Sequence, residues 1–356
     1  MTSILILKFA ALGDVLRTTS ILPGLHARYP GASITWVTAP AARELVERHP
    51  LIADVESADP RDAADMQALG ERLAATDWTR VLSFDDEDPL CDLATALGAR
   101  GAEISGAWRD RAGARAYTPD VAPWFDMGLL SVHGKDVADR MKVENERSHP
   151  AIYADMLGIE MGRPELPLPE TALQFAAAHY AASSNGGAGP RIGLNTGAGG
   201  RWPSKELSVE RVVELGRRLS AVHPGAEFVV LGGPPEAGRN AQILSGLRAL
   251  DPAPHVIDGG TDNSLTHFAA LVGRCDLLVT SDSLALHLAI ARDVAIVAFF
   301  APTSAAEIEL YGLGEKVQST APDACSYRPD ADTSTVTPER IADAALRVLA
   351  MREPMG

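Results

Sequence analysis

The sequence predicts an α/β fold with parallel strands, distributed over two domains. Short apolar runs of the buried-strand type alternate with segments of helical periodicity, and this alternation is typical of β-α-β units. The chain has 356 residues, of which 46% are hydrophobic, enough for two domains with cores of their own. A stretch rich in serine, glycine and proline near the middle separates two halves that each repeat the alternation.

The first half carries three predicted strands, each followed by a predicted helix. We expect the strands at residues 4–7, 34–38 and 81–84, and the helices near residues 15–29, 41–48 and 89–97. The strand segments are largely apolar and short, which is typical of strands buried on both faces of a parallel sheet.

The second half carries four predicted strands and a helix at its end. We expect strands at residues 192–195, 228–231, 277–280 and 295–299, and helices near residues 209–222, 237–250, 265–272 and 284–291. The last periodic stretch, residues 338–351, predicts a terminal helix with Thr337 as N-cap and Pro338 in the first helical position.

These elements predict the following domain organisation. We expect a first domain over residues 1–165, a linker over 166–190, a second domain over 191–335, and a helix over 336–356 that packs back toward the first domain. The linker contains an alanine-rich helix and ends in the octet Ser183-Ser184-Asn185-Gly186-Gly187-Ala188-Gly189-Pro190, a composition typical of a connection between domains.

Charge and cysteine content exclude several classes of function. The chain has 32 Lys and Arg against 47 Asp and Glu, a formal net charge of −15, so it lacks the basic surplus of proteins that bind nucleic acid or anionic lipid by charge. Its three cysteines are odd in number and widely spaced, which fits neither a disulfide framework nor a paired-cysteine zinc site. We expect a cytoplasmic protein without signal peptide or transmembrane segment, whose substrate can still lie on a membrane.

A first cluster of candidate site residues follows the first strand. Lys8 ends the strand, and Leu12-Gly13-Asp14 leads into a helix. A strand-to-helix turn of this kind directs backbone N–H groups and Asp14 toward the edge of the sheet where ligands bind. Asp14 can equally be a helix cap, and spacing alone favours the cap. A dinucleotide fingerprint is absent because Gly13 stands alone.

A glycine-rich loop follows the strand at 192–195. It reads Asn195-Thr196-Gly197-Ala198-Gly199-Gly200-Arg201-Trp202-Pro203-Ser204-Lys205. Glycines allow a backbone to approach a phosphate closely, and Arg201 and Lys205 can neutralise it. The order of residues is not that of a P-loop, and the alternative is a surface loop.

A third cluster, Ser281-Asp282-Ser283-Leu284-Ala285-Leu286-His287, follows the strand at 277–280 and opens a helix. The N–H groups and dipole of such a helix N-terminus suit a diphosphate. Asp282 can also be only an N-cap, and a helical histidine such as His287 is more often a structural hydrogen-bonding group.

Two further segments carry charged side chains. Residues 105–145 form a long connection with basic and aromatic residues, among them Trp108, Arg109, Trp124 and Lys135, and this composition suits either an anionic or sugar acceptor or a decorated surface loop. The run Asp85-Asp86-Glu87-Asp88 has Asp-x-Asp spacing, but we interpret it as a solvated acidic loop. No histidines are paired at metal-ligand spacing, and we expect no metal.

Together these clusters resemble the ADP-heptose:lipopolysaccharide heptosyltransferase family, which is glycosyltransferase family nine. The resemblance covers most of the chain. It rests on residues 4–8 with Leu12-Gly13-Asp14-Val15, on Arg147-Ser148-His149-Pro150-Ala151-Ile152-Tyr153, on Gly200-Arg201-Trp202-Pro203-Ser204-Lys205, on Asp282-Ser283 with His287, and on Ala301-Pro302-Thr303. It implies the GT-B fold, in which two Rossmann-like domains face each other across a cleft.

The resemblance also implies an activity and the residues that serve it. The family transfers a heptose from ADP-heptose to an acceptor hydroxyl with inversion, needs no metal, and uses no cofactor beyond the nucleotide-sugar donor. Asp14 matches the catalytic base. The residues implied in donor binding are Thr196, Gly197, Arg201, Lys205, Glu236, Asp282, Ser283, Leu284 and His287, and those expected near the acceptor are Lys8, Arg17, Arg109 and Lys135.

Departures from the family pattern leave the substrates open. Ser283, Leu284 and Ala285 stand where the family has Thr-Gly-Leu, so the sugar can be a heptose or a related one. The acceptor can be a lipid-linked core or a small secondary metabolite. The alternatives are a transferase using another nucleotide sugar, a nucleotide-sugar epimerase, and a nucleotide-sugar-binding protein without activity.

Overall fold

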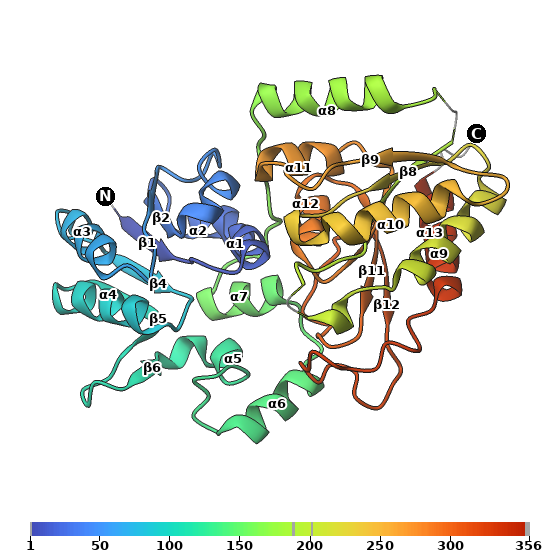
Figure 1. Cartoon of the computed structure of the whole chain (residues 1–356). Helices are drawn as coiled ribbons and strands as arrows, with labels where there is room; N and C mark the ends of the chain where they lie inside the picture. Colours follow the sequence, from blue (N-terminus) through green and yellow to red (C-terminus); the bar gives the residue numbers. More distant parts are fainter. Residues whose placement is uncertain (1, 187–188, 201, 353–356) are drawn as a thin grey trace. The chain divides into compact units, whose positions relative to one another are not determined.

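The structure is a computed structural model that describes residues 2–186, 189–200 and 202–352. The chain divides into two compact units, Met1–Pro167 and Leu168–Gly356. Each unit is built around its own six-stranded sheet (Figure 1), so the prediction of two α/β domains is confirmed.

The sheet of the first unit has the strand order β3-β2-β1-β4-β5-β6. Its neighbours are parallel except β6, which forms an antiparallel pair with β5. The strands are β1 (Ser3–Leu7), β2 (Ser33–Thr38), β3 (Asp54–Ser57), β4 (Arg80–Ser83), β5 (Glu103–Arg109) and β6 (Arg115–Tyr117).

Helices cover the sheet of the first unit on both faces. From β1 to β3 the chain moves toward one edge of the sheet, and from β3 through β4 to β5 it moves toward the opposite edge. Right-handed crossovers in opposite directions place their helices on opposite faces of the sheet. Leu5 and Leu7 pack with Leu69 and Leu93 in one core. The helices are α1 (Leu12–Thr18), α2 (Leu22–Arg28), α3 (Ala63–Leu73), α4 (Asp88–Ala99), α5 (Ala122–Phe125), α6 (Lys135–Glu144) and α7 (His149–Leu157).

The sheet of the second unit has the order β12-β11-β10-β7-β8-β9, with every pair parallel. Its central strands are buried throughout because both faces are covered. The strands are β7 (Arg191–Asn195), β8 (Glu227–Val230), β9 (His255–Asp258), β10 (Leu277–Ser281), β11 (Ala295–Phe300) and β12 (Gly314–Gln318).

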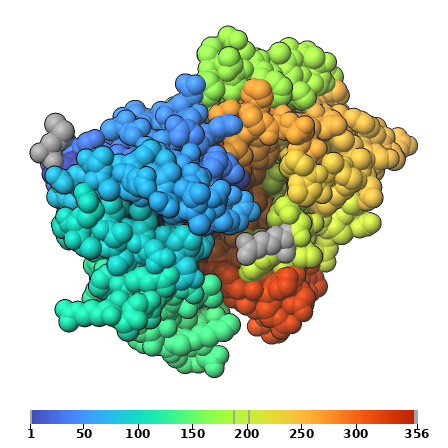
Figure 2. Space-filling view, turned by 60° about the vertical axis from the view of Figure 1, so that its left-hand side comes forward, coloured from blue at the N-terminus to red at the C-terminus, as the bar shows by residue number. Residues whose placement is uncertain are grey.

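The helices of the second unit form two layers. One core joins the sheet to α9 (Val209–Val222), α10 (Ala237–Arg248) and the last helix, α13 (Pro338–Arg352). On the other face lie α11 (Leu265–Val272) and α12 (Leu284–Ala291). The helix α8 (Glu170–Ser183) packs on α11, and Figure 2 shows it as a yellow-green ridge beside orange residues of the same unit.

The position of α8 differs from the interpretation of residues 166–190 as a linker. The boundary between the units falls after Pro167, and α8 belongs to the second unit. Its Ala172, Ala176 and Tyr180 are buried, and the Tyr180 hydroxyl donates to the carbonyl of Leu271 at 3.0 Å. The apolar side of this alanine-rich helix is therefore used in packing. The terminal helix packs on α9 and on β10–β12 of its own unit, and its predicted packing toward the first domain stays a prediction.

The structure confirms the seven predicted strands to within one residue and corrects three other expectations. The single helix expected near residues 15–29 is divided into α1, a 3-10 helix, Thr19–Ile21, and α2. The segment expected as a helix at 41–48 is a 3-10 helix, Pro40–Leu45; it lies between Pro40 and Pro50, so few residues are available to propagate an α-helix. The stretch 105–145 is not one long connection, since it contains most of β5, all of β6, and the helices α5 and α6. Within the described residues, no helix combines the length and the apolar character needed to cross a membrane.

Candidate active site

Both sheets have a topological switch point, where the chain leaves two neighbouring strands in opposite directions. In the first unit this point lies between β1 and β4, and in the second between β7 and β10. Ligands of open parallel sheets bind outside the carboxyl ends of the strands at such points. Four residues lie at the two switch points: Asn195 ends β7, and Lys8, Asp85 and Asp282 follow β1, β4 and β10.

Lys8 and Asp85 form a buried ion pair at the switch point of the first unit. The Lys8 ammonium also donates to the carbonyl of Ala10. The second carboxylate oxygen of Asp85 accepts from the backbone N–H groups of Phe9 and Ala10. Burial raises the pKa of the Asp85 carboxyl, while the Lys8 cation and the two N–H groups oppose that rise.

The position of Asp85 contradicts its interpretation as part of a solvated acidic loop. Its side chain is only 8% exposed, because β4 runs beside β1 and delivers the acidic run next to Lys8. Sequence reasoning missed this residue, although a signal existed: Asp85 follows a predicted strand by one residue, at an edge where ligand-binding residues gather.

Asp14 lies in the first turn of α1 and is 37% exposed. The interpretation of Asp14 as the cap of a helix that opens at Val15 is wrong, because α1 begins at Leu12 and its N-cap is Ala11. From the third helical position, one carboxylate oxygen of Asp14 accepts from Ala11 N–H at 3.4 Å. The other lies 3.0 Å from the Arg17 guanidinium. Arg17 in turn lies over the ring of Trp124 from α5, 5.4 Å from the ring centroid. Asp14, Arg17 and Trp124 thus form one connected group.

Trp124 belongs to an aromatic cluster that continues to the end of β4. Its ring meets His149 edge-on at 4.9 Å and Tyr153 at 5.6 Å. Tyr153 stacks on His149 and also contacts Phe84, the residue before Asp85. Here α7, which carries His149–Tyr153 of the family resemblance, supports the surroundings of Arg17 and Asp14.

The other two predicted acceptor residues are held in ion pairs of their own. Arg109 ends β5 and pairs with Asp92 and Asp88 of α4 at 2.6 and 2.7 Å; hydrogen bonding to these carboxylates raises its pKa. Lys135 is exposed and pairs with Asp139 one turn further along α6. Their contact with an acceptor stays a prediction.

Lys205 and Asp282 form the corresponding ion pair in the second unit. The Lys205 ammonium lies 2.9 Å from the Asp282 carboxylate and donates to the Asp282 carbonyl at 3.1 Å. Both side chains are 20% exposed. Lys205 also lies 5.4 Å from the Trp202 ring centroid. The loop after β7 is in this way joined to the end of β10.

Glu236 fixes the glycine-rich loop from the inside of the second unit. It is buried, and its two oxygens accept from Gly199 N–H and, at 2.7 Å, from Gly233 N–H. A Cβ on Gly197 would lie 2.6 Å from Glu236 Cγ, so only glycine fits there. The structure thus places the predicted Gly197 and Glu236 in contact, and a further contact of Glu236 with a ribose stays a prediction.

Arg239 is a second support of this loop that sequence reasoning missed. From the first turn of α10 its guanidinium donates to the carbonyl and the hydroxyl of Thr196 at 3.2 and 3.1 Å. Burial lowers its pKa. No local motif marks this arginine, because Thr196 is 43 residues away in the sequence.

The N-terminus of α12 completes the site of the second unit. The Ser283 hydroxyl, at the N-cap, lies 3.4 Å from the Asn195 amide and 3.2 Å from the Thr280 hydroxyl, and makes no cap to the helix backbone. Leu284 opens the helix and is half-buried, while His287, one turn in, is buried. The predicted Arg201 lies outside the described residues.

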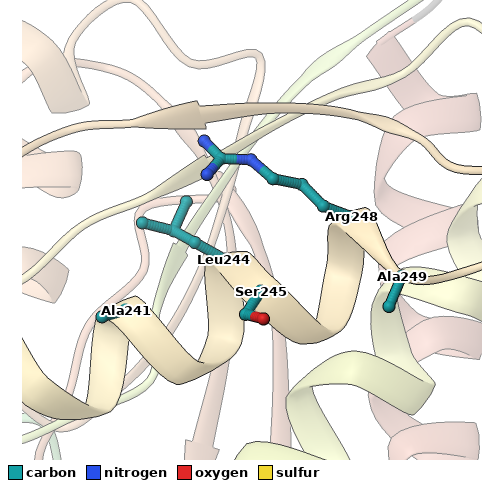
Figure 3. Close-up of a pocket in the computed structure, with 5 residues that line it drawn as sticks. All are labelled: Ala241, Leu244, Ser245, Arg248 and Ala249. Carbon is teal, nitrogen blue, oxygen red and sulfur yellow. The ribbon is translucent and has the colours of Figure 1, made fainter.

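A hollow of about 430 Å³ along α10 is separate from these strand ends. It is lined by Ala241, Leu244, Ser245, Arg248 and Ala249. Figure 3 shows these side chains, of which Arg248 is the long cationic one. The helix begins near Glu236 at the carboxyl edge and runs back along the sheet, so Arg248 lies toward the opposite edge. Residues 2–186, 189–200 and 202–352 contain no group of three or more His, Cys, Asp or Glu that could hold a metal ion.

Comparison of the sequence with known proteins and protein families identifies glycosyltransferase family 9. The model of glycosyltransferase family 9 (heptosyltransferase) matches residues 131–330, more than half of the chain. The chain is 26% identical over 320 residues to lipopolysaccharide heptosyltransferase 2 of Salmonella typhimurium, covering 85% of this chain and 83% of the relative.

Solved structures agree on the fold. A glycosyltransferase family 9 protein of Veillonella parvula superposes with a TM-score of 0.76 at 19% identity, covering 98% of both chains. The ADP-heptose lipopolysaccharide heptosyltransferase II of E. coli superposes with a TM-score of 0.69 at 20% identity, covering 99% of both chains. The two Rossmann-like units are therefore those of the GT-B fold, as predicted.

Proposed function

The chain belongs to glycosyltransferase family 9, the heptosyltransferase family, and we propose that it transfers a heptose, or a closely related sugar, from an ADP-activated donor to a sugar acceptor with inversion. The observation that carries the proposal is the arrangement at the switch point between β7 and β10. A glycine-rich loop, the N-terminus of α12 and the Lys205 ammonium gather there, and these are the groups that bind a diphosphate.

The donor's diphosphate is assigned to this arrangement. In the transfer the bond between the anomeric carbon and the diphosphate breaks, and ADP leaves with an added negative charge. Lys205 and the N–H groups of the first turn of α12 stabilise that charge. Glu236 and Arg239 touch the loop from behind, and their role is to keep it in shape before the donor binds.

Asp14 of the first unit is assigned the role of general base. It removes the proton of the acceptor hydroxyl as that oxygen attacks the anomeric carbon on the face opposite the diphosphate. Its partly exposed carboxylate is accessible to a substrate, and Arg17 holds one of its oxygens. We assign the acceptor to a sugar hydroxyl of lipopolysaccharide, since lipopolysaccharide appears in the name of the relative from Salmonella typhimurium.

Nucleotide binding tests the donor assignment. Isothermal calorimetry with ADP, UDP, GDP, CDP and dTDP should give selective binding of ADP, with ADP-heptose binding more tightly. Lys205→Met should weaken ADP binding about 10- to 100-fold, since a hydrogen bond to a charged group contributes about 1.5–3 kcal/mol.

The matched control is Arg347→Met, which removes a cation from an exposed ion pair with Glu315 in the same unit and should leave ADP binding unchanged. Selective binding of another nucleotide would overturn the ADP assignment. Equal effects of the two substitutions would overturn the role of Lys205.

A further inference from the structure

We propose that Asp85 is a positioning residue that holds the turn in front of Asp14, acting through Lys8 and the backbone of Phe9 and Ala10. The inference rests on the proposed function, in which Asp14 is the base. It assigns a role to a buried acidic residue at the switch point of the first sheet that the reaction itself does not use.

Every polar atom of the Asp85 carboxylate is directed at the chain that leaves β1. One oxygen receives the Lys8 ammonium, and the other receives the N–H groups of Phe9 and Ala10. Lys8 closes the arrangement by donating to the Ala10 carbonyl. Three consecutive residues are thereby tied to the end of β4, a strand that is more than 70 residues away in the sequence.

The segment Lys8–Ala10 that Asp85 holds ends one residue before Ala11, whose N–H contacts Asp14. Ala11 follows Ala10 directly, donates its N–H to Asp14 and accepts at its carbonyl from Val15 N–H at 2.9 Å. Ala11 is the N-cap of α1, so its position fixes where the helix starts. A shift of Phe9 or Ala10 therefore moves the first turn of α1 and, with it, the Asp14 carboxylate.

Stability alone does not account for a buried pair at this point. Removing two charges from water costs free energy that their attraction only partly offsets, and apolar replacements of such pairs are often neutral or stabilising. The pair instead fixes the conformation of the turn, because the N–H groups of Phe9 and Ala10 and the carbonyl of Ala10 all receive hydrogen-bond partners from it. A reacting group displaced by about 1 Å can lose 10²-fold in rate.

The test is a double-mutant cycle between Asp85 and Asp14. We expect Asp85→Asn to lower kcat about 10²-fold for transfer from ADP-heptose to a lipopolysaccharide core acceptor, with the Kd for ADP unchanged. In the Asp14→Asn background the same substitution should have no further effect on kcat, because a residue that acts through Asp14 has nothing left to position. If Asp85→Asn does not fold, Asp85→Glu, which keeps the charge but not the geometry, takes its place in the cycle.

Hydrogen exchange of the amides at residues 9–14 gives a readout that does not need the acceptor. Exchange in this segment should rise in Asp85→Asn, while exchange in residues 195–200 stays as in the wild type. The matched control is Glu227→Gln, which removes the buried carboxylate that pairs with Arg191 at 2.9 Å, where β7 and β8 begin. It should lower stability and leave exchange at residues 9–14 unchanged.

Two outcomes overturn the inference. One is a kcat loss of equal factor from Asp85→Asn in both backgrounds, which would mean that Asp85 does not act through Asp14. The other is unchanged exchange at residues 9–14. If instead Asp14→Asn alone leaves kcat at the wild-type value, the proposed function fails in its choice of base, and the exchange result still decides whether Asp85 holds the turn.

Discussion

The Lys205 ammonium lies 2.9 Å from the Asp282 carboxylate, across the switch point between β7 and β10. The first sheet repeats this relationship with Lys8 and Asp85 across its own switch point. The two pairs differ in burial: the side chains of the first-unit pair are 7% and 8% exposed, and both of those in the second unit are 20% exposed. Water and a ligand can reach Lys205, so its pair can exchange a carboxylate for a phosphate, while the buried pair keeps a turn in place.

The contact between Gly197 and Glu236 predicts that Gly197→Ala weakens donor binding. The added Cβ would overlap Glu236 Cγ at 2.6 Å, and the loop must move away from its support. We expect the Kd for ADP to rise roughly 10-fold, equivalent to about 1.4 kcal/mol, as measured by calorimetry. Gly238→Ala is the control, because nothing lies within 4 Å of its Cβ position. An unchanged Kd in Gly197→Ala would show that the loop geometry does not matter for the donor.

The interactions of Arg17 predict that Arg17→Met lowers kcat about 10- to 100-fold without changing ADP binding. The substitution removes the cation that holds Asp14 at 3.0 Å and that lies over Trp124, so the carboxylate loses an orienting contact. Steady-state kinetics measure the effect. Arg43→Met, which removes an exposed ion pair with Glu47 in the same unit, should keep wild-type kcat. The role of Arg17 is refuted if both variants behave alike.

The packing of α8 predicts that Tyr180→Phe destabilises the protein without lowering activity. The buried hydroxyl loses its hydrogen bond to Leu271 of α11, at a cost of about 1 kcal/mol, which corresponds to a fall in Tm of about 2–4 °C for a domain of this size. Gln174→Ala, at an exposed position of the same helix, should stay close to the wild-type Tm. An unchanged Tm in Tyr180→Phe would mean that α8 contributes little to the second unit.

The lowered pKa of His49 predicts that the free energy of unfolding decreases in acid. It is 4% exposed, and burial, with a smaller contribution from His26, lowers its pKa to about 4. The unfolded chain binds this proton at about pH 6.5, so the free energy of unfolding falls as the pH drops from 6.5 toward 4. At pH 5 the loss due to His49 is about 2 kcal/mol.

Urea unfolding at pH 7.5 and pH 5 measures this effect against His49→Asn. Asn keeps an acceptor for Leu51 N–H, which His49 accepts through Nδ1 at 3.2 Å, but does not titrate. The wild type should lose about 2 kcal/mol more than the variant between the two pH values. Equal losses would show that His49 is not the responsible group.

The central strands could be predicted from the sequence because they are buried on both faces and read as continuous apolar runs. The sequence prediction missed β3, β5, β6, β9 and β12. Three of these strands are short, polar and at a sheet edge, where one side meets solvent: β3 reads DVES, β6 reads RAY and β12 reads GEKVQ. Their polar residues look like loops until pairing with a neighbouring strand is known. The alanine-rich composition of α8 led to the opposite error. It predicts part of a linker, but the small apolar side chains of the helix pack on α11.

Residues of the site could be predicted where a local pattern marks them. Asp14, Lys205 and Asp282 follow strands and open helices or loops, so their place at the sheet edge follows from chain direction alone. Asp85 and Arg239 could not be found in this way, because their partners lie 77 and 43 residues away. Only strand order brings Asp85 to Lys8, and only the packing of α10 brings Arg239 to Thr196.

The most direct test of the central claim is the rate of acceptor-dependent ADP release from ADP-heptose by the wild type and by Asp14→Asn. We predict that the wild type releases ADP only with a lipopolysaccharide core acceptor present, and that Asp14→Asn lowers kcat about 10²- to 10⁴-fold with an unchanged Kd for ADP. Asp54→Asn, an exposed aspartate that begins β3, should match the wild type. Conversion of the donor without acceptor, as an epimerase would show, or full activity of Asp14→Asn, would contradict the account.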